Sequence, residues 1–408
     1  MNEGLRDMAH VGVGDSPEFR LLAACSWIAT ERFESLQRER VRQACAGEIP
    51  WDRFLSLVAV HGVQPQAYEA LRRHGEVVPQ DVLARLREHR LRISAASLRQ
   101  AAELARLAGL FAAEGINLLP LKGVVLSQQL YEDPGMRVSG DLDLMVQPDQ
   151  CEKVGEILER EGYCCGLHGN PLTGKQKEHL RKHEYHLAYS NENKHISIEL
   201  HWSIGELWLP EHLRLLWENS YASDWAGRPV RMLDPDILLL SLCDHGARHR
   251  FCCMKWLSDV ARLFAIRPSP DISRLLHFAE LFDLKRTLAH TALLVHWVYG
   301  LPLDEELVKL ADADPVAASL SRKVYNLISQ PVEASAAKRR GDPLLSLRML
   351  RLRPSIPLRH VVRTAIIAPT DFIHLQLPDS LFWLYAPLRP VFWLWRYFCP
   401  ADVRGRRA

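Results

Sequence analysis

Three acidic side chains in the middle of the chain have the chemistry to bind a cation. Asp141 and Asp143 are separated by one residue in the segment GDLDLMV, and Glu199 lies in the later segment ISIELH. Alternate residues of a strand point to the same face, so the two aspartates would project side by side. Parallel carboxylates repel each other unless a cation lies between them. A hard divalent ion that accepts oxygen ligands, Mg²⁺ or Mn²⁺, is the expected occupant.

Glu199 is expected to join these aspartates from a neighbouring strand. In residues 196–201, apolar side chains alternate with Ser197, Glu199 and His201, which would therefore share one face. Three carboxylates on adjacent strands can bind two divalent ions, an arrangement that stabilises the transition state of phosphoryl transfer. His201 would act beside Glu199, either as its hydrogen-bond partner or as a contact to a bound nucleotide.

A glycine turn upstream has the features of an anion site. Lys122-Gly123 lies between a short apolar strand and a helix, where glycine lets the backbone approach an anion. The first amides of the helix and its dipole then favour negative charge. Lys122 would add a point charge for a triphosphate, and Arg137 another. Ser127 and Lys255 are further candidates for contact with the nucleotide.

The elements that must hold these residues alternate between strand and helix only in the middle of the chain. Apolar patterning and turn signals predict the following strands and helices there: strands over 116–120, 142–146, 185–189 and 195–200, with a hairpin turn at 190–193, and helices over 123–131 and 148–161. Helical periodicity predicts the other segments as helices: 51–71, 94–114, 236–249, 255–264, 272–282 and 285–299. The predicted fold class is α+β, a small mixed sheet with helices between helical N- and C-terminal regions.

The 408 residues are expected to form four regions. These are an N-terminal helical region (1–92), the α/β core (93–209), a helical domain (210–333) and a basic C-terminal arm rich in proline and aromatic residues (334–408). The arm is expected to pack back onto the body, with contact to a membrane surface or a partner as the alternative.

Composition limits the class of partner. Lysine and arginine number 51 and aspartate and glutamate 49, so the net charge is +2, which disfavours nucleic acid as the main partner. The nine cysteines form no C-x-x-C pair, which indicates reduced thiols and a cytoplasmic location. No signal peptide and no uncharged apolar run long enough to cross a membrane is expected.

The segment LKGVVLSQQLYEDPGMRVSGDLDLMV resembles the signature of the uncharacterised nucleotidyltransferase family of the DNA polymerase β superfamily. The core of that family has a glycine turn, a D-x-D strand and a third acid on a later strand. Lys122-Gly123, Asp141-x-Asp143 and Glu199 match these features, and the resemblance extends over roughly residues 40–300. It implies a polymerase-β-like core that transfers a nucleoside monophosphate from an NTP to a hydroxyl or phosphate acceptor and releases pyrophosphate. Asp141, Asp143 and Glu199 would hold two Mg²⁺ or Mn²⁺ ions.

Two departures from the superfamily pattern keep other functions open. Val124 follows Gly123 where many members have serine, and the third acid is glutamate where aspartate is common. A non-catalytic nucleotide-binding or scaffold protein is therefore the main alternative. A histidine-metal hydrolase is a lesser one, based on two groups of histidines: His179, His183 and His186, and His245 and His249. The acceptor stays open between a small molecule, a glycan precursor and a peptide.

Overall fold

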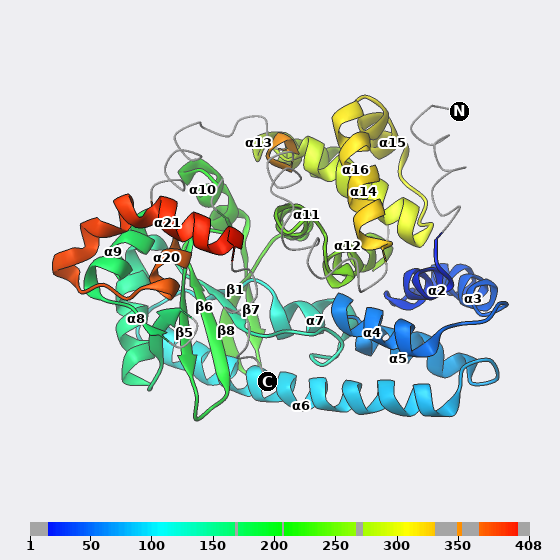
Figure 1. Cartoon of the computed structure of the whole chain (residues 1–408), viewed down its shortest axis with the longest axis horizontal. Coiled ribbons are helices and arrows are strands. Elements are labelled where there is room, and N and C mark those ends of the chain that lie inside the picture. The colour runs from blue at the N-terminus through cyan, green and yellow to red at the C-terminus, as the bar shows by residue number, and fades with distance from the viewer. Residues whose placement is uncertain are drawn as a thin grey trace. The chain divides into compact units, whose positions relative to one another are not determined.

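The chain forms two compact units in the computed structural model, which describes residues 15–167, 170–205, 208–266, 272–330, 349–352 and 367–398 (Figure 1). The first unit consists of the described parts of Met1–Leu110, Pro120–Gly140 and Leu209–Ser355. The second consists of the described parts of Phe111–Leu119, Asp141–Trp208 and Ile356–Ala408. The four regions expected from the sequence remain a prediction.

A mixed six-stranded sheet, in the order β1-β2-β6-β5-β3-β4, organises the second unit. Its strands are β1 (Leu119–Pro120), β2 (Leu142–Met145), β3 (Cys164–Leu167), β4 (Asn170–Pro171), β5 (His186–Asn191) and β6 (Ile196–His201). Strands β2 and β6 pair in parallel, whereas β5 pairs antiparallel with both β6 and β3. The mixed sheet between helices confirms the predicted fold class.

The second unit also contains helical segments. They are η3 (Pro148–Gln150), α8 (Cys151–Arg160), α9 (Gly174–His183), α20 (Pro369–His374), η5 (Asp379–Leu384) and α21 (Tyr385–Phe398). Helix α8 contacts β3 and β6, and its side chains Val154 and Leu158 are buried. Helix α9 contacts β5 and begins with a capping box between Thr173 and Gln176, which fixes where the helix starts.

The described part of the C-terminal arm packs against α9. The buried Tyr385 hydroxyl donates a hydrogen bond to Leu375 O at 2.7 Å and accepts one from Gln176 Nε2 at 2.8 Å. Asp379 accepts a hydrogen bond from the Lys175 amide at the first turn of α9. This contact is the one expected for an arm that folds back onto the body. The stretches 334–348, 353–366 and 399–408 of the predicted arm lie outside the described residues.

The first unit is mainly helical. Its elements are α2 (Pro17–Cys25), α3 (Glu31–Ala44), α4 (Trp51–His61), α5 (Gln64–Leu71), η2 (Arg72–His74), α6 (Gln80–Ala113, as far as Leu110), α7 (Gly123–Tyr131), α10 (Pro210–Asn219), β7 (Tyr221–Trp225), β8 (Arg228–Met232), α11 (Pro235–Arg248), α12 (Met254–Ile266), α13 (Ile272–Leu281), α14 (Lys285–Tyr299), α15 (Glu305–Asp312), α16 (Pro315–Ile328) and η4 (Leu350–Leu352). Helix α14 is buried along most of its length, because it packs against α11, α12 and α16. None of the described helices is both long and apolar enough to cross a membrane.

Three sequence predictions about single elements are wrong. The helix expected over 94–114 begins at Gln80, because the charged residues before Ser94 continue the helical turns without a break. The helix expected over 51–71 is two helices, α4 and α5, since Gly62 adopts a left-handed φ of 67° between them. The region after residue 210, expected to be all helical, contains the hairpin β7–β8, whose turn is closed by a hydrogen bond from the Gly227 amide to Asp224.

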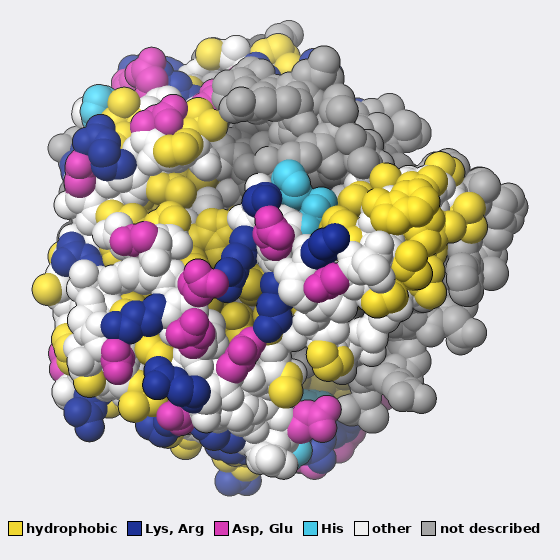
Figure 2. Space-filling model, turned by 90° about the vertical axis from the view of Figure 1, so that its left-hand side faces the viewer, with side chains coloured by type: hydrophobic (Ala, Val, Ile, Leu, Met, Phe, Trp, Pro, Cys, Tyr) yellow, Lys and Arg dark blue, Asp and Glu magenta, His cyan; other side chains and the backbone are white. Residues whose placement is uncertain are grey.

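The surface carries charges of both signs. Figure 2 shows one face of the molecule, on which lysine and arginine side chains alternate with aspartate and glutamate. No broad single-sign field covers this face, in agreement with the net charge of +2. The described cysteines are thiols and not members of disulfides, as the sequence predicts.

Candidate active site

Strands β2 and β6 bring two of the predicted acids together. The parallel register of the strands places Asp143 opposite Glu199. The following residues in each strand, Leu144 and Leu200, point to the other face and are buried. The two carboxylates therefore share one face of the sheet, as strand alternation predicts. Asp143 is only 5% exposed, and Glu199 is half-buried.

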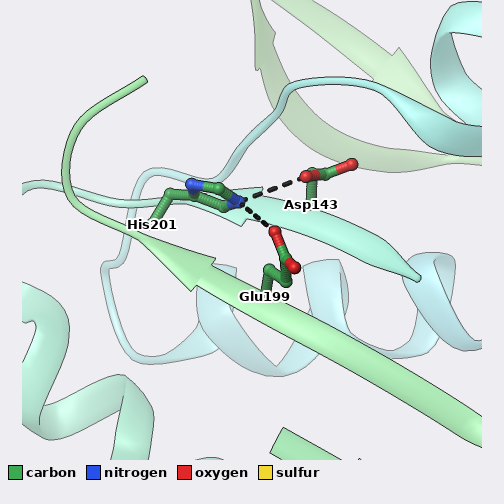
Figure 3. A group of neighbouring side chains, drawn as sticks. All are labelled: Asp143, Glu199 and His201. Carbon is green, nitrogen blue, oxygen red and sulfur yellow. Dashed lines mark hydrogen bonds and ion pairs between the residues drawn. The ribbon is translucent and has the colours of Figure 1, made fainter. Parts of the chain in front are cut away.

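His201 completes a group of three on this face of the sheet. Its Nε2 atom lies 3.2 Å from Asp143 Oδ1 and 3.3 Å from Glu199 Oε2. Figure 3 shows the Nε2 edge of the ring directed at both carboxylates. We refer to Asp143, Glu199 and His201 as the acid–histidine triad. One ligand atom of each lies within 4.8 Å of the others, a combination that recurs nowhere else in the part of the chain that the structure describes.

The electrostatic surroundings keep Glu199 ionised. Burial is the largest single influence and raises the pKa of the carboxyl group, and the nearby Asp143 charge acts in the same direction. The hydrogen bond from His201 and the charge of His186, whose Nε2 lies 3.8 Å from Glu199 Oε1, outweigh both. The net pKa of Glu199 therefore lies below its ordinary value, and the group is a carboxylate at neutral pH.

Asp141, the first acid of the D-x-D pair, immediately precedes β2 and is half-buried. It is not a member of the acid–histidine triad, and its role as a metal ligand stays a prediction. The contact between His201 and Asp143 was not foreseen, since the sequence paired His201 with Glu199 alone. The two-residue spacing between Glu199 and His201 was the available signal, but it does not reveal which strand lies opposite.

The predicted phosphate turn lies in the first unit. Helix α7 begins at Gly123, which has a φ of 65°, a left-handed conformation that favours glycine. Lys122 occupies the N-cap position, and no side chain caps this end of the helix. Val124 and Val125 are buried and hold the first turn in the core. Binding of phosphate at the start of α7 stays a prediction.

Lys122 lies next to a histidine of α11. Its Nζ atom is 3.5 Å from His245 Nδ1. Burial lowers the pKa of His245 well below its ordinary value, and the charges of Lys122 and His249 lower it further. The imidazole is therefore neutral at neutral pH, and Nδ1 can accept a hydrogen bond from the ammonium group.

Arg137 and Lys255, the other predicted phosphate contacts, both lie near a buried acid of the first unit, Asp259. Arg137 Nε donates a hydrogen bond to Asp259 Oδ2 at 2.8 Å, and both side chains are almost fully buried. Burial raises the pKa of Asp259, and the charge of Arg137 opposes that rise. Lys255 Nζ lies 3.4 Å from Val138 O and 5.9 Å from the centre of the Trp256 ring. Contact of either cation with phosphate stays a prediction.

Ser127, considered as a substitute for the missing serine after the glycine, is fully buried in α7. Its hydroxyl donates a hydrogen bond of 2.7 Å to Asp133 O in the turn that follows the helix. The hydroxyl thus ties the second half of α7 to that turn, and a contact with phosphate stays a prediction.

The histidine groups of the hydrolase alternative form pairs of stacked or tilted rings. His179 and His183 have ring centres 4.4 Å apart, and His245 and His249 have ring centres 4.7 Å apart. Neither pair acquires a third ligand among the residues that the structure describes. His186 instead lies on β5 opposite His201, beside the acid–histidine triad.

Comparison with known families agrees with this geometry. A family model described as "uncharacterised nucleotidyltransferase" matches residues 47–300, which is more than half of the chain. The chain belongs to this nucleotidyltransferase family. The matched range contains the α7 turn, β2 and β6, so the resemblance seen in the sequence is confirmed. No curated protein and no solved structure matches the chain.

Membership of the nucleotidyltransferase family carries a general activity. It indicates nucleotidyl transfer, with an NTP as substrate and a divalent metal as cofactor. The acid–histidine triad is a group of side chains with the donor atoms and burial needed to hold such a metal.

Proposed function

We propose that this nucleotidyltransferase moves a nucleoside monophosphate from an NTP to a hydroxyl or phosphate acceptor and releases pyrophosphate. The observation that carries the proposal is the acid–histidine triad, built on adjacent parallel strands inside a nucleotidyltransferase family match. A buried carboxylate beside a half-buried one on the same sheet face is costly to desolvate, and a bound dication offsets that cost.

The residues present fit a divalent metal. Asp143 and Glu199 supply oxygen donors, and in the proposal Asp141 adds a third carboxylate from the residue before β2. In their carboxylate forms, these side chains would attract Mg²⁺ or Mn²⁺. A bound ion would neutralise charge on the triphosphate and on the leaving pyrophosphate.

The side chains of the chain itself position the reactants and accept a proton. The acceptor oxygen forms a bond to the α-phosphorus while the bond between that phosphorus and the pyrophosphate oxygen breaks. When the acceptor is a hydroxyl, its proton goes to a carboxylate oxygen of Glu199, which is ionised at neutral pH because its pKa is lowered. Most of the rate gain would come from positioning and charge neutralisation.

Lys122 and Gly123 would contact the β- and γ-phosphates. The left-handed glycine at the start of α7 leaves the backbone free of a Cβ atom, and the helix dipole favours an anion at this end. Lys122, whose Nζ lies 3.5 Å from Nδ1 of the buried His245, would add a point charge for the triphosphate. Arg137, which donates a hydrogen bond to Asp259, would add a further charge for the triphosphate.

The acceptor we propose is a small molecule, a glycan precursor or a peptide. The interspersed charges of Figure 2 and the net charge of +2 disfavour a long nucleic acid, whose binding requires a clear positive excess. A cytoplasmic location, expected from the scattered cysteines, stays a prediction.

A non-catalytic nucleotide-binding protein is the second candidate. The observation in its favour is Val124, which is buried in the first turn of α7 where many superfamily members present a serine hydroxyl. The burial of Asp143 and the convergence of Glu199 and His201 on it favour catalysis instead, because two acids held together in a partly desolvated site are costly without a metal ion.

Pyrophosphate release tests the proposal. Purified protein is incubated with each labelled NTP, Mg²⁺ or Mn²⁺ and a panel of acceptors, in parallel with Asp143→Asn and with Asp149→Asn, an exposed acid of the same unit. We expect labelled product and pyrophosphate from the wild type and from Asp149→Asn, and none from Asp143→Asn. Metal-dependent NTP binding with no pyrophosphate release across the whole panel would favour the non-catalytic candidate. Equal product from all three proteins would refute the role of Asp143.

A further inference from the structure

We propose that His201 is itself a metal ligand, and that its imidazole makes the site select a first-row transition ion such as Mn²⁺ over Mg²⁺. This inference rests on the proposed function for its premise that a dication binds between β2 and β6. It goes further by assigning one nitrogen and two oxygen donors to that ion.

The single proton that His201 Nε2 can carry is too few for the two carboxylates that the atom faces. Nε2 of a neutral imidazole carries at most one hydrogen, yet it faces Asp143 Oδ1 and Glu199 Oε2 at nearly equal distances, 3.2 and 3.3 Å (Figure 3). One N–H cannot give two carboxylates a well-aligned hydrogen bond at the same time. A dication that all three atoms face would be coordinated by both carboxylates at once and by Nε2 of the tautomer that carries its proton on Nδ1.

The spacing of the three donor atoms is close to that of ligands around one metal ion. Adjacent ligands of an ion with metal–ligand distances of about 2.1 Å lie roughly 3 Å apart when the ligand–metal–ligand angle is near 90°. Both separations from His201 Nε2 are close to this value, and one atom from each residue lies within 4.8 Å of the others. The side chains thus need only small rotations to surround one ion.

Charge and burial agree with a dication. Asp143 and Glu199 contribute two negative charges, and the exposed fractions of Asp143 and His201 are 5% and 2%. The adjacent strand β5 places His186 Nε2 3.8 Å from Glu199 Oε1 and contributes no residue to the triad. The formal charge of the donor set with a neutral His201 is therefore −2, which a divalent ion balances.

The nitrogen donor decides the class of ion. Mg²⁺ demands near-ideal oxygen coordination and gives up its water reluctantly, whereas imidazole is a good ligand for first-row transition metals. Replacing one carboxylate by imidazole therefore weakens the site for Mg²⁺ relative to Mn²⁺. A site on the same strands with carboxylate donors and no imidazole would lack this discrimination.

Electron paramagnetic resonance of Mn²⁺ tests the assignment without using activity. The full-length protein is titrated with MnCl₂, and pulsed spectra are searched for coupling between the ion and an imidazole ¹⁴N nucleus. The variants are His201→Gln, which keeps an oxygen and a nitrogen near the same place, and His186→Gln as the matched control from the facing strand. Circular dichroism verifies that each variant is folded.

We expect imidazole coupling in the wild type and in His186→Gln, and its loss in His201→Gln. The Mn²⁺ affinity of His201→Gln should fall by about tenfold or more, while its Mg²⁺ affinity changes much less. Failure of Mn²⁺ to bind, binding without nitrogen coupling, or coupling that survives in folded His201→Gln would each overturn the inference. Nitrogen coupling without nucleotidyl transfer would instead refute the proposed function and leave His201 as a ligand.

Discussion

Replacing Arg137 by methionine leaves the carboxylate of Asp259 without its ion-pair partner inside the first unit. The two side chains are 5% and 0% exposed, and their Nε–Oδ2 distance is 2.8 Å. Removing one member of a buried ion pair typically costs about 3–5 kcal/mol, because the remaining charge stays buried. The complete burial of Asp259 puts the expected loss of unfolding free energy within that range.

Hydrogen exchange followed by mass spectrometry measures this loss locally. The amides of α12, the helix that carries Asp259, report the opening equilibrium of their surroundings. A loss of about 3–5 kcal/mol corresponds to exchange faster by about 10²–10⁴-fold, since each 1.4 kcal/mol is a factor of ten. The exposed pair Arg38–Glu34, with side chains 57% and 41% exposed, supplies the control. Arg38→Met should change stability by no more than about 1 kcal/mol.

A double variant separates the loss of a contact from the cost of a stranded charge. Arg137→Met combined with Asp259→Leu removes both charges, and we expect it to recover most of the lost protection, because apolar side chains of similar volume can replace a buried pair. Two results would refute the reasoning: protection in Arg137→Met within about tenfold of the wild type, or a double variant no more protected than the single one.

Three further predictions concern other parts of the chain. Gly123→Ala and Gly227→Ala, with native φ values of 65° and 77°, should each lower stability by about 1–2 kcal/mol, but only Gly123→Ala should weaken NTP binding. Thermal unfolding measures the loss of stability, and nucleotide titration measures the binding. Equal NTP binding by both variants would contradict the role of the α7 turn. Burial lowers the pKa of His290 to about 3, so the folded state binds fewer protons than the unfolded state below the ordinary value of 6.5. Stability should therefore decline by about 1.4 kcal/mol per unit as the pH falls from 6.5 towards 3, and the slope in denaturant titrations should be smaller in His290→Gln; an unchanged slope would argue against a neutral buried imidazole. Tyr385→Phe removes the hydroxyl that joins Leu375 to α9 and should destabilise the arm by about 1–3 kcal/mol. The expected result is faster limited proteolysis of the chain after residue 366. Unchanged cleavage would show that ring packing alone holds the arm.

Local signals in the sequence were sufficient for much of the fold. Helix α7 begins and ends where glycine and apolar spacing predict, and α14 matches its predicted range in full. The β5–β6 hairpin follows from two alternating segments around a polar turn. The error in α6 arose because its first half is charged, and a solvated helix has little apolar periodicity from which to locate its start.

The sequence predicts which active-site residues share a face within one strand, but it does not predict which residues of two strands lie opposite each other. Alternation within β6 places Glu199 and His201 on one face. Alternation within β2 places Asp143 on the face opposite to that of Leu142. Which residue of β2 lies opposite Glu199 is set by a parallel pairing between segments more than fifty residues apart, and no local rule specifies it. The burial of Arg137 against Asp259 was missed for the same reason, since an arginine that neutralises an interior acid has the same sequence signature as one that meets phosphate.

The short turn between β5 and β6 has a consequence for how chains of this kind can diverge. Asn191 pairs with Ile196, the Lys194 amide donates a hydrogen bond to Asn191 Oδ1, and His195 adopts a φ of 52°. Adding or deleting a single amino acid here would shift β6 by one position and turn Glu199 and His201 to the opposite side. The longer connection over residues 147–185 contains α8 and β3, which contact β6 and β5, so only the loops between its elements can change in length without disturbing the site. Natural variation in length should therefore accumulate in those loops, while the hairpin turn keeps its size.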